Sequence, residues 1–401
     1  MVVDPTPREA SAPSRLPLTT GAVQVRISSQ DRRETLRLTG TALGEIEFER
    51  VGDQIRSSLG ASSTRFVVES RPGGGGVGLA GRIYPGELVV ELHGAGGLRA
   101  FNRVALEDYV AGVVPAELVL WSAAPAEIEA QAIAARTYAL RSIADRASRG
   151  GSAFLWDDTR DQVYGGRFQA GSSAAARSVE ARLFDAVGRT RGLVLRGELG
   201  ELYDIRFHAS CGGHTTSPAA AFPLESTLHH EPVRCEPCLA LGAEERTWSA
   251  DDSRSREVHW IWTAEPRALG NLARSLGIGS NVRGYSAPEI DTHGRWHSVE
   301  IVGDVGRKRC DLTRLRRELG ATHLKSGKLL RTWPAADEEV LRGLYFEGLG
   351  RGHGAGLCQT GSHEYATRGW TARAILAHYL PHSVLDRLDT PSAAHRLAAP
   401  R

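Results

Sequence analysis

A change of pattern near residue 105 constrains the fold of this chain more than any other feature. From about Val23 to Val104 the sequence alternates apolar and polar residues in short segments between Gly, Asp and Ser turns, which is typical of β-strands. The segment PAEIEAQAIAARTYALRSIADRA then begins at Pro125 and repeats small and apolar residues every three or four positions. That period predicts a long helix with an Ala-rich stripe facing the core. The two parts together predict an α+β fold.

The remaining patterns predict how the chain divides. We expect a β-rich N-terminal unit at residues 22–100, packed on a mixed α/β domain with a substrate groove. That domain is predicted in two parts, 101–245 and 333–386, interrupted by an α/β lobe at 246–332. Residues 1–21 are predicted to be a flexible leader and residues 387–401 a flexible tail, because neither has an apolar pattern that would order it.

Charge and hydropathy exclude two kinds of partner. The chain has 49 Lys and Arg residues against 47 Asp and Glu, so its net charge of +2 gives no global field that would attract nucleic acid. A basic run at 307–317 is interpreted as one solvated helix face. No stretch approaches the roughly 18 apolar residues that a spanning helix needs, and the first residues show no signal-peptide core. We therefore expect neither a nucleic-acid partner nor a transmembrane segment.

One glutamate, Glu117, differs from the other acids by its setting. Its sequence neighbours are largely apolar: Val113, Val114, Leu118, Leu120 and Trp121. Desolvation by such neighbours raises a carboxyl pKa, which keeps a proton available near neutral pH, as a general acid requires. The alternative for any single glutamate is a solvated or capping side chain.

Cysteine and histidine gather in two short motifs, FHASCGGHT and CEPC. The candidate ligands are His208, Cys211, His214, Cys235 and Cys238. Four nitrogen or sulfur ligands suit tetrahedral zinc, and the Gly212–Gly213 pair supplies the turn that brings positions three apart together. We expect this zinc to be structural, because cysteine-rich sites are usually closed. The alternative is one disulfide together with buried thiols.

A glycine-dense segment, GLGRGHGAGLCQTGSHEYATRGW, projects His353, Cys358 and Gln359 from a loop. Residues 350–355 fit G-x-G-x-x-A, but a dinucleotide site lacks the acidic residue about 20 positions on and a second βαβ unit. Cys358 with His353 or His363 would give a thiol nucleophile and its base, although a cysteine in this setting is more often a small buried hydrophobe. No G-x-S-x-G motif indicates a serine nucleophile.

Taken in order, the motifs VALEDYVAGVVPAEL, EIEAQAIAARTYAL, DTRDQVYGG, FHASCGGHT and GRGHGAGLCQTG resemble the SpoIID/LytB family over about residues 80–385. Glu117 matches the catalytic acid of the family, and Arg136 and Tyr138 match its AART-Y motif. The resemblance implies that Arg136, Tyr138, Tyr164, His353 and Gln359 position a glycan substrate. Cys358 departs from the family, because many members carry methionine there.

The resemblance also implies an activity and a cellular location. Its SpoIID branch implies a lytic transglycosylase that cleaves the MurNAc–GlcNAc bonds of peptidoglycan strands stripped of stem peptides. Its LytB branch implies a peptidoglycan-binding protein without chemistry of its own that enhances an N-acetylmuramoyl-L-alanine amidase. Family members resemble this chain in a cysteine and histidine metal site, and they work in the cell envelope, outside the cytoplasm. A metal-stabilised structural protein is a third class to consider.

The sequence favours the first of these chemistries. A lytic transglycosylase needs one carboxyl group, because the C6 hydroxyl of the sugar attacks C1 and no water is required. A hydrolase of the usual kind needs a second carboxylate about 5 to 9.5 Å from the first, and no second acid shares the apolar setting of Glu117.

Overall fold

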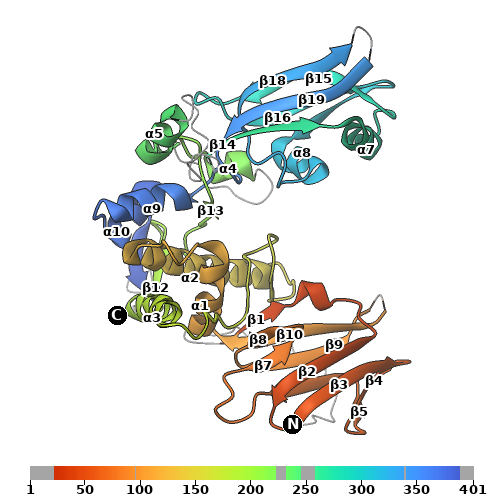
Figure 1. The fold of residues 1–401 in the computed structure, drawn as a ribbon, viewed down its shortest axis with the longest axis vertical. Helices are drawn as coiled ribbons and strands as arrows, with labels where there is room; N and C mark the ends of the chain where they lie inside the picture. Colours follow the sequence, from red (N-terminus) through yellow and green to blue (C-terminus); the bar gives the residue numbers. More distant parts are fainter. Residues whose placement is uncertain (1–21, 95, 223–231, 245–257, 338–339, 389–401) are drawn as a thin grey trace, which may run out of the picture. The chain divides into compact units, whose positions relative to one another are not determined.

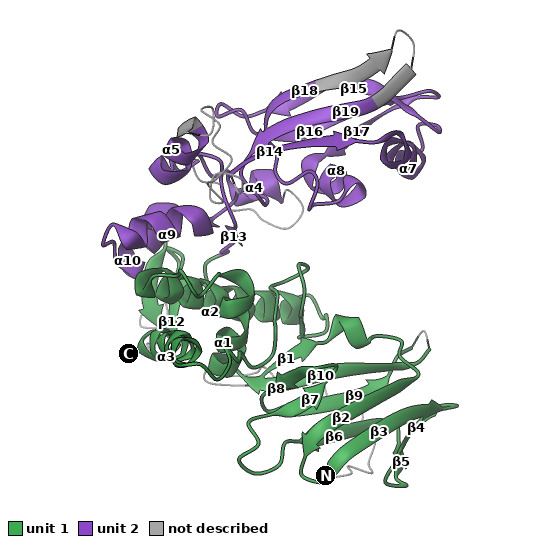
Figure 2. Cartoon of the chain, viewed as in Figure 1, with its two compact units in different colours: residues 1–203, 383–401 green, residues 204–382 purple. Residues whose placement is uncertain are grey.

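The computed structural model describes residues 22–94, 96–222, 232–244, 258–337 and 340–388. Its chain divides into two compact units, which Figure 2 distinguishes by colour. Unit 1 comprises residues 1–203 and 383–401, and unit 2 comprises residues 204–382. Helices and strands occur in both units and form several sheets, so the predicted α+β class is confirmed (Figure 1). The predicted leader and most of the predicted tail lie outside the described residues.

Unit 1 begins with two sheets. A five-stranded sheet has the order β11-β1-β10-β9-β6 and a six-stranded sheet the order β5-β4-β3-β2-β7-β8. Their strands are β1 (Ala22–Arg26), β2 (Thr35–Thr41), β3 (Gly44–Val51), β4 (Gln54–Ser57), β5 (Ser62–Ser63), β6 (Arg65–Glu69), β7 (Val77–Leu79), β8 (Arg82–Tyr84), β9 (Glu87–Leu92), β10 (Leu98–Ala105) and β11 (Leu155–Trp156). Pairing is antiparallel except between β1 and β11. Alternate residues of β2 and β4 are buried, as the sequence pattern predicts.

Three helices complete unit 1: α1 (Leu106–Glu117), α2 (Pro125–Ser148) and α3 (Ala174–Arg189). The predicted start of α2 at Pro125 is confirmed, and the Glu127 carboxylate accepts a hydrogen bond from the Ala124 amide at 3.2 Å, which caps the helix. The Ala-rich stripe of α2 is buried in one core with the strands, so the N-terminal β-rich part and these helices form a single packed unit. Strand β12 (Leu193–Arg196) pairs with β21 (Val384–Arg387), and this pair joins a segment near the C-terminus to unit 1.

Unit 2 contains a lobe with its own core. Strands β14 (His259–Ala264), β18 (Lys328–Asp337) and β19 (Val340–Leu349) form one sheet, and β15 (Val282–Ile290), β16 (Trp296–Gly303) and β17 (Arg307–Asp311) form another. Helices α7 (Pro266–Leu276) and α8 (Leu312–Leu319) pack against them. Buried Leu344 and Phe346 belong to this core, so the lobe extends past the predicted boundary at 332, because β18 and β19 pair along their length.

The rest of unit 2 carries the cysteine and glycine motifs. Its elements are β13 (Phe207–His208), α4 (Pro218–Ala221), α5 (Glu236–Glu244), β20 (Leu357–Cys358), α9 (Gln359–Thr367) and α10 (Ala372–Tyr379). Strands β13 and β20 pair in parallel, with His208 opposite Cys358, although about 150 residues separate them in the sequence. Among the residues that the structure describes, no helix combines the length and apolarity needed to cross a membrane.

Candidate functional site

Glu117 is the last residue of α1, and a loop from elsewhere in unit 1 holds its side chain. The Val163 amide donates a hydrogen bond of 2.9 Å to Glu117 Oε1. The carboxyl group is half-buried, next to the fully buried Val113 and Val114 of the preceding turn. A carboxyl group in this position is fixed by the backbone and remains partly open to a ligand.

The loop that holds Glu117 is itself anchored at Asp161. Its buried carboxylate accepts hydrogen bonds from the Tyr138 hydroxyl at 3.1 Å, the Arg146 guanidinium at 2.6 Å and the Trp156 amide at 2.7 Å. Three donors on one carboxylate restrain the loop strongly. Tyr138, predicted to touch substrate, is thus bonded to the loop that holds Glu117.

Tyr164 of the same loop is part of the protein interior. Its side chain is fully buried, its hydroxyl donates to Asn102 Oδ1 at 2.7 Å, and its ring packs on Tyr109 at a centroid distance of 5.1 Å. Gly112 of α1 has no space for a side chain, because a Cβ there would lie 2.4 Å from the Tyr164 ring. The prediction that Tyr164 binds substrate is corrected to a packing role that holds the loop against α1.

Arg136 is also buried, and it pairs with an acid other than Glu117. Its Nε and Nη2 atoms donate to the two oxygens of Glu107 at 3.0 and 2.6 Å, and Nη1 donates to the Leu193 carbonyl at 3.0 Å. Its side chain is 0% exposed, so it offers no atom to a glycan strand. The predicted substrate contact is therefore corrected: Arg136 ties α1 and α2 to β12 as a bidentate ion pair.

The acids around Glu117 in the sequence are engaged in structural contacts. Glu107 binds Arg136, Asp161 binds three donors, Glu127 caps α2, and Glu129 pairs with Arg189 at 2.8 Å. These contacts give the four acids structural roles within unit 1.

An exposed apolar turn directly follows Glu117. The sequence alone indicates these residues only as apolar neighbours of the acid, not as an exposed surface. Val119 is 70% exposed and Trp121 is 57% exposed. Arg182 of α3 donates hydrogen bonds to the carbonyls of Leu120 and Ala123, both at 3.1 Å, so the turn is fixed. Exposed tryptophan on a fixed backbone is suited to stacking on an apolar ligand face. In the sequence, the tryptophan four residues after Glu117 is the signal from which this exposed surface could have been predicted.

Three surface hollows in the described part of the chain do not include Glu117 in their lining. Two hollows in unit 1, of about 330 and 500 Å³, and one in unit 2, of about 280 Å³, are each lined by other residues. The substrate groove predicted from the sequence stays a prediction.

The second candidate site is a group of four buried cysteines in unit 2. The Sγ atoms of Cys211, Cys235, Cys238 and Cys358 all lie within 4.8 Å of one another, and all four thiols are free. Zinc bonds of about 2.3 Å in tetrahedral geometry place ligand sulfurs about 3.8 Å apart. The distance of 3.6 Å between the sulfurs of Cys238 and Cys358 agrees with that value, so the donor set fits zinc.

Hydrogen-bond donors around the sulfurs support thiolate ligands. The amides of Cys211 and Gly361 donate to Cys358 Sγ at 3.3 and 3.4 Å, and the Tyr379 hydroxyl lies 3.1 Å from Cys235 Sγ. Such outer donors orient metal ligands and stabilise their charge. A side chain at position 361 would collide with Tyr379 and Cys235, which explains glycine there.

The pKa values within the group point the same way. Hydrogen bonds from the other three thiols hold the pKa of Cys238 well below its usual range. Burial raises the pKa values of Cys211 and Cys358 well above theirs. A bound metal ion stabilises the deprotonated form of each cysteine ligand. A group of one thiolate and several buried thiols would therefore be stabilised by binding a cation.

The two predicted histidine ligands lie outside this group. His208 is buried and its Nδ1 lies 3.0 Å from the Ala355 carbonyl, while burial lowers its pKa to about 4. His214 is half-buried and stacks on His293 with ring centroids 4.0 Å apart. The predicted ligand set is therefore corrected: Cys358 joins the three predicted cysteines, and neither histidine does.

The glycine loop serves internal packing around β13. Gly356 has a φ of 74° and sits where a Cβ would lie 2.0 Å from the Arg206 carbonyl. His353 Nδ1 accepts a hydrogen bond from the Ala355 amide at 3.1 Å, and burial lowers its pKa well below its usual range. His353 lines the hollow of unit 2, whereas Gln359 starts α9 and is half-buried. Both belong to unit 2, and Glu117 belongs to unit 1.

Comparison with known proteins identifies the region of the chain that contains Glu117. A model of the SpoIID family, described as Stage II sporulation protein, matches residues 94–196. These residues form a SpoIID domain. The SpoIID domain includes β10, α1, α2, β11, α3 and β12, and it contains Glu117 together with Val163 and Asp161 of the loop that holds it. The four cysteines lie beyond the matched residues.

Two curated proteins extend the likeness. The chain is 29% identical to an uncharacterized protein of Brachyspira hyodysenteriae over 283 residues, which covers 69% of this chain and 66% of that relative. It is 26% identical to the Stage II sporulation protein D of Bacillus amyloliquefaciens over 308 residues, covering 72% and 76%. The aligned region is thus slightly under two thirds of the first relative's length. The SpoIID domain supports a function related to the bacterial cell wall.

Proposed function

We propose that this protein is a lytic transglycosylase that cleaves the MurNAc–GlcNAc bonds of peptidoglycan strands lacking stem peptides. The observation that carries the proposal is the half-buried Glu117 carboxyl, fixed by the Val163 amide while the neighbouring acids are engaged elsewhere. One positioned carboxyl group is what this reaction needs. The substrate lies outside the cytoplasmic membrane, so the protein is expected to work there.

In the proposed reaction Glu117 acts twice. It first donates its proton to the glycosidic oxygen, so the leaving sugar departs with a new hydroxyl while the C1–O bond breaks. It then accepts the proton of the C6 hydroxyl as that oxygen bonds to C1 and closes the 1,6-anhydro ring. The carboxyl group ends in its starting state. Because the nucleophile belongs to the substrate itself, effective concentration replaces a second catalytic acid.

The other residues of the SpoIID domain have supporting roles in this proposal. Asp161, Tyr138 and Arg146 hold the loop that orients Glu117. Trp121 supplies an exposed ring four residues after the acid, on which a sugar ring can stack. Gln359 stays a predicted glycan contact of unit 2.

The four cysteines are proposed to hold one structural zinc ion. Cys211, Cys235, Cys238 and Cys358 would supply its ligands, and four protein ligands leave no open position for catalysis. When bound, the metal cross-links three segments of unit 2 that are far apart in the sequence. Ser210 Oγ, 3.6 Å from Cys238 Sγ, would support this arrangement from outside.

The main alternative, a non-catalytic enhancer of an amidase, is separated from the enzyme by product analysis. The purified chain is incubated with glycan strands stripped of stem peptides, and separately with intact wall material and an amidase. We expect products ending in 1,6-anhydro-MurNAc from the first incubation, detected by mass spectrometry. Intact strands in the first incubation together with faster amide cleavage in the second would favour the enhancer.

Replacing Trp121 tests the sugar-stacking role. Trp121→Ala is expected to raise the substrate concentration for half-maximal rate about tenfold, with a smaller effect on the maximal rate, because a stacking contact of about 1.4 kcal/mol is lost. Leu199→Ala is the matched control, since Leu199 is an 83% exposed apolar residue on another turn of unit 1. Equal effects of the two substitutions would remove Trp121 from the substrate site.

A further inference from the structure

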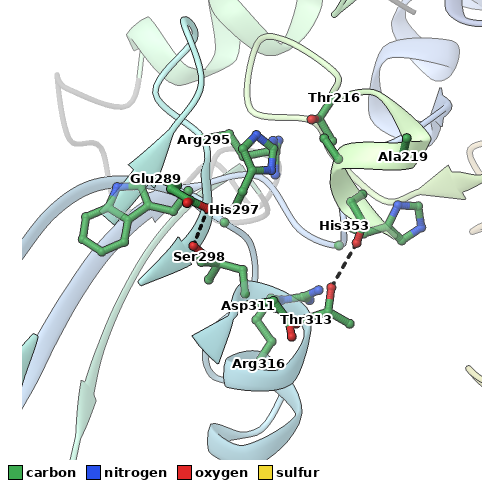
Figure 3. Close-up of a pocket in the computed structure, with 16 residues that line it drawn as sticks. Thr216, Ala219, Glu289, Arg295, His297, Ser298, Asp311, Thr313, Arg316 and His353 are labelled. Carbon is green, nitrogen blue, oxygen red and sulfur yellow. Dashed lines mark hydrogen bonds between the residues drawn. The ribbon is translucent and has the colours of Figure 1, made fainter. Parts of the chain in front are cut away.

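Two arginines line the cavity of about 280 Å³ in unit 2, and neither has a carboxylate partner among the described residues. They are Arg295, which precedes β16, and Arg316 of α8 (Figure 3). Their cavity has room for about nine water molecules at roughly 30 Å³ each. Cations buried without counter-charges are costly, so their presence around a cavity requires an explanation.

Arg295 is the more buried of the two, at 3% exposure. Its Nη2 atom donates to the Cys211 carbonyl at 2.6 Å, and its buried Nη1 atom has no hydrogen-bond partner. Gly354 faces the guanidinium, and a Cβ there would lie 2.7 Å from Nη1. The absence of a side chain at Gly354 thus makes room for the guanidinium group, one of whose buried donors remains unsatisfied.

Arg316 is bonded only to neutral groups in the described structure. Its Nε and Nη2 atoms donate to the carbonyls of Leu324 and Lys325 at 2.9 and 2.8 Å. Burial, and then the charge of Arg295, lower the pKa of Arg316 to about 10. The two guanidinium groups therefore repel each other, and that repulsion disappears when an anion lies between them.

The acids at the cavity are already used. Glu289 accepts a hydrogen bond from Ser298 at 2.6 Å and pairs with Arg309 at 3.4 Å. Asp311 caps α8 by accepting from the Arg314 amide at 2.7 Å. Both carboxylates therefore bind partners other than Arg295 and Arg316.

Other charged groups also lie near Arg295. Burial lowers the pKa of Arg295, whereas the charge of Asp291, which pairs with His297 at 3.3 Å, raises it. Lys328 adds a further positive charge near Arg295. The charged lining of the cavity thus consists of two guanidinium groups without a carboxylate partner and two carboxylates that have other partners.

We propose that this cavity binds a small organic carboxylate between Arg295 and Arg316. A planar guanidinium matches a carboxylate in geometry and charge. Trp296, Leu312 and the alanines of α4 supply apolar contact for the body of the ligand. Glu289 and Asp311, which also line the cavity, oppose a dianion such as phosphate, so a monoanion is favoured. This site is separate from Glu117 and does not depend on the reaction proposed there.

The test is isothermal titration calorimetry of the full chain with lactate and with N-acetylmuramic acid, which share the carboxylate. N-acetylglucosamine is the neutral control and inorganic phosphate the dianion control. We expect saturable binding of at least one carboxylate probe, none of the neutral sugar and weaker binding of phosphate. Arg316→Met should weaken carboxylate binding about tenfold or more, because a charge-assisted contact is lost while the apolar stem is kept.

Two further variants make the result specific. Arg307→Met removes an exposed arginine of the same lobe outside the cavity and should leave binding unchanged. Arg295→Lys keeps the positive charge near the Cys211 carbonyl but loses the planar guanidinium group that can bind both carboxylate oxygens. This variant should also weaken binding. Glu117→Gln should bind carboxylate like the parent, which separates this site from the proposed reaction. No binding of either carboxylate probe, tighter binding of phosphate, or equal losses in the Arg307 and Arg316 variants would overturn the proposal.

Discussion

Glu117→Gln is expected to lower the rate of 1,6-anhydro product formation by at least about a hundredfold, because a general acid and base contributes roughly 10² to 10⁴ in rate. The substitution is close to isosteric, and an amide oxygen can still accept the Val163 hydrogen bond. The fold should therefore survive, which circular dichroism and thermal unfolding would verify. Products are quantified by mass spectrometry on strands stripped of stem peptides.

Glu129→Gln is the matched control for this experiment. Glu129 lies on α2 within the same SpoIID domain and pairs with the exposed Arg189, so its neutral variant should retain the parent's rate. Equal rates for the parent and Glu117→Gln would end the role proposed for Glu117. A fall in rate for both variants would indicate an effect of charge rather than of proton transfer.

Removal of the metal is expected to have the largest effect on stability. We predict about one zinc ion per purified chain, and loss of cooperative unfolding of unit 2 after treatment with a strong chelator, because structural zinc in small domains contributes about 10 to 16 kcal/mol. Cys358→Ser alone should abolish metal binding, since it removes one of four ligands. Metal content is measured by mass spectrometry of the element, and unfolding by calorimetry.

Two variants separate the four-cysteine site from the ligand set that the sequence favoured. His214→Ala should retain zinc, because its ring stacks on His293 outside the sulfur group. Cys310→Ser should retain it as well, since Cys310 is buried in the lobe core away from the other four. Full metal content in Cys358→Ser, or loss of metal in His214→Ala, would contradict the site as described.

Local pattern was sufficient for the main elements of the fold. The helix from Pro125 follows directly from the residue period and the proline at its start, and it is present. The lobe boundary was less accessible, because Pro334 and the alanines after it obscure strand β18. Strand pairing across long separations has no local signature.

The candidate sites show the same limit at the level of single residues. Arg136 looks like a ligand-binding cation in the sequence, but its partner Glu107 lies 29 positions earlier and only packing of α1 on α2 reveals it. Cys358 looks like a small hydrophobe, and the parallel pairing of β13 with β20 brings it to cysteines more than 100 residues away. In contrast, the apolar residues next to Glu117 in the sequence were visible at once, and Val113 and Val114 are buried in the structure.

The claim that one carboxyl group suffices is tested most directly by cleaving stripped glycan strands in water enriched in ¹⁸O. Ring closure by the C6 hydroxyl uses no water, so the account predicts products that end in 1,6-anhydro-MurNAc and carry no ¹⁸O at that end. A reducing end with one ¹⁸O atom would show that water attacks C1, and Glu117 would then need a second catalytic acid that this site does not provide.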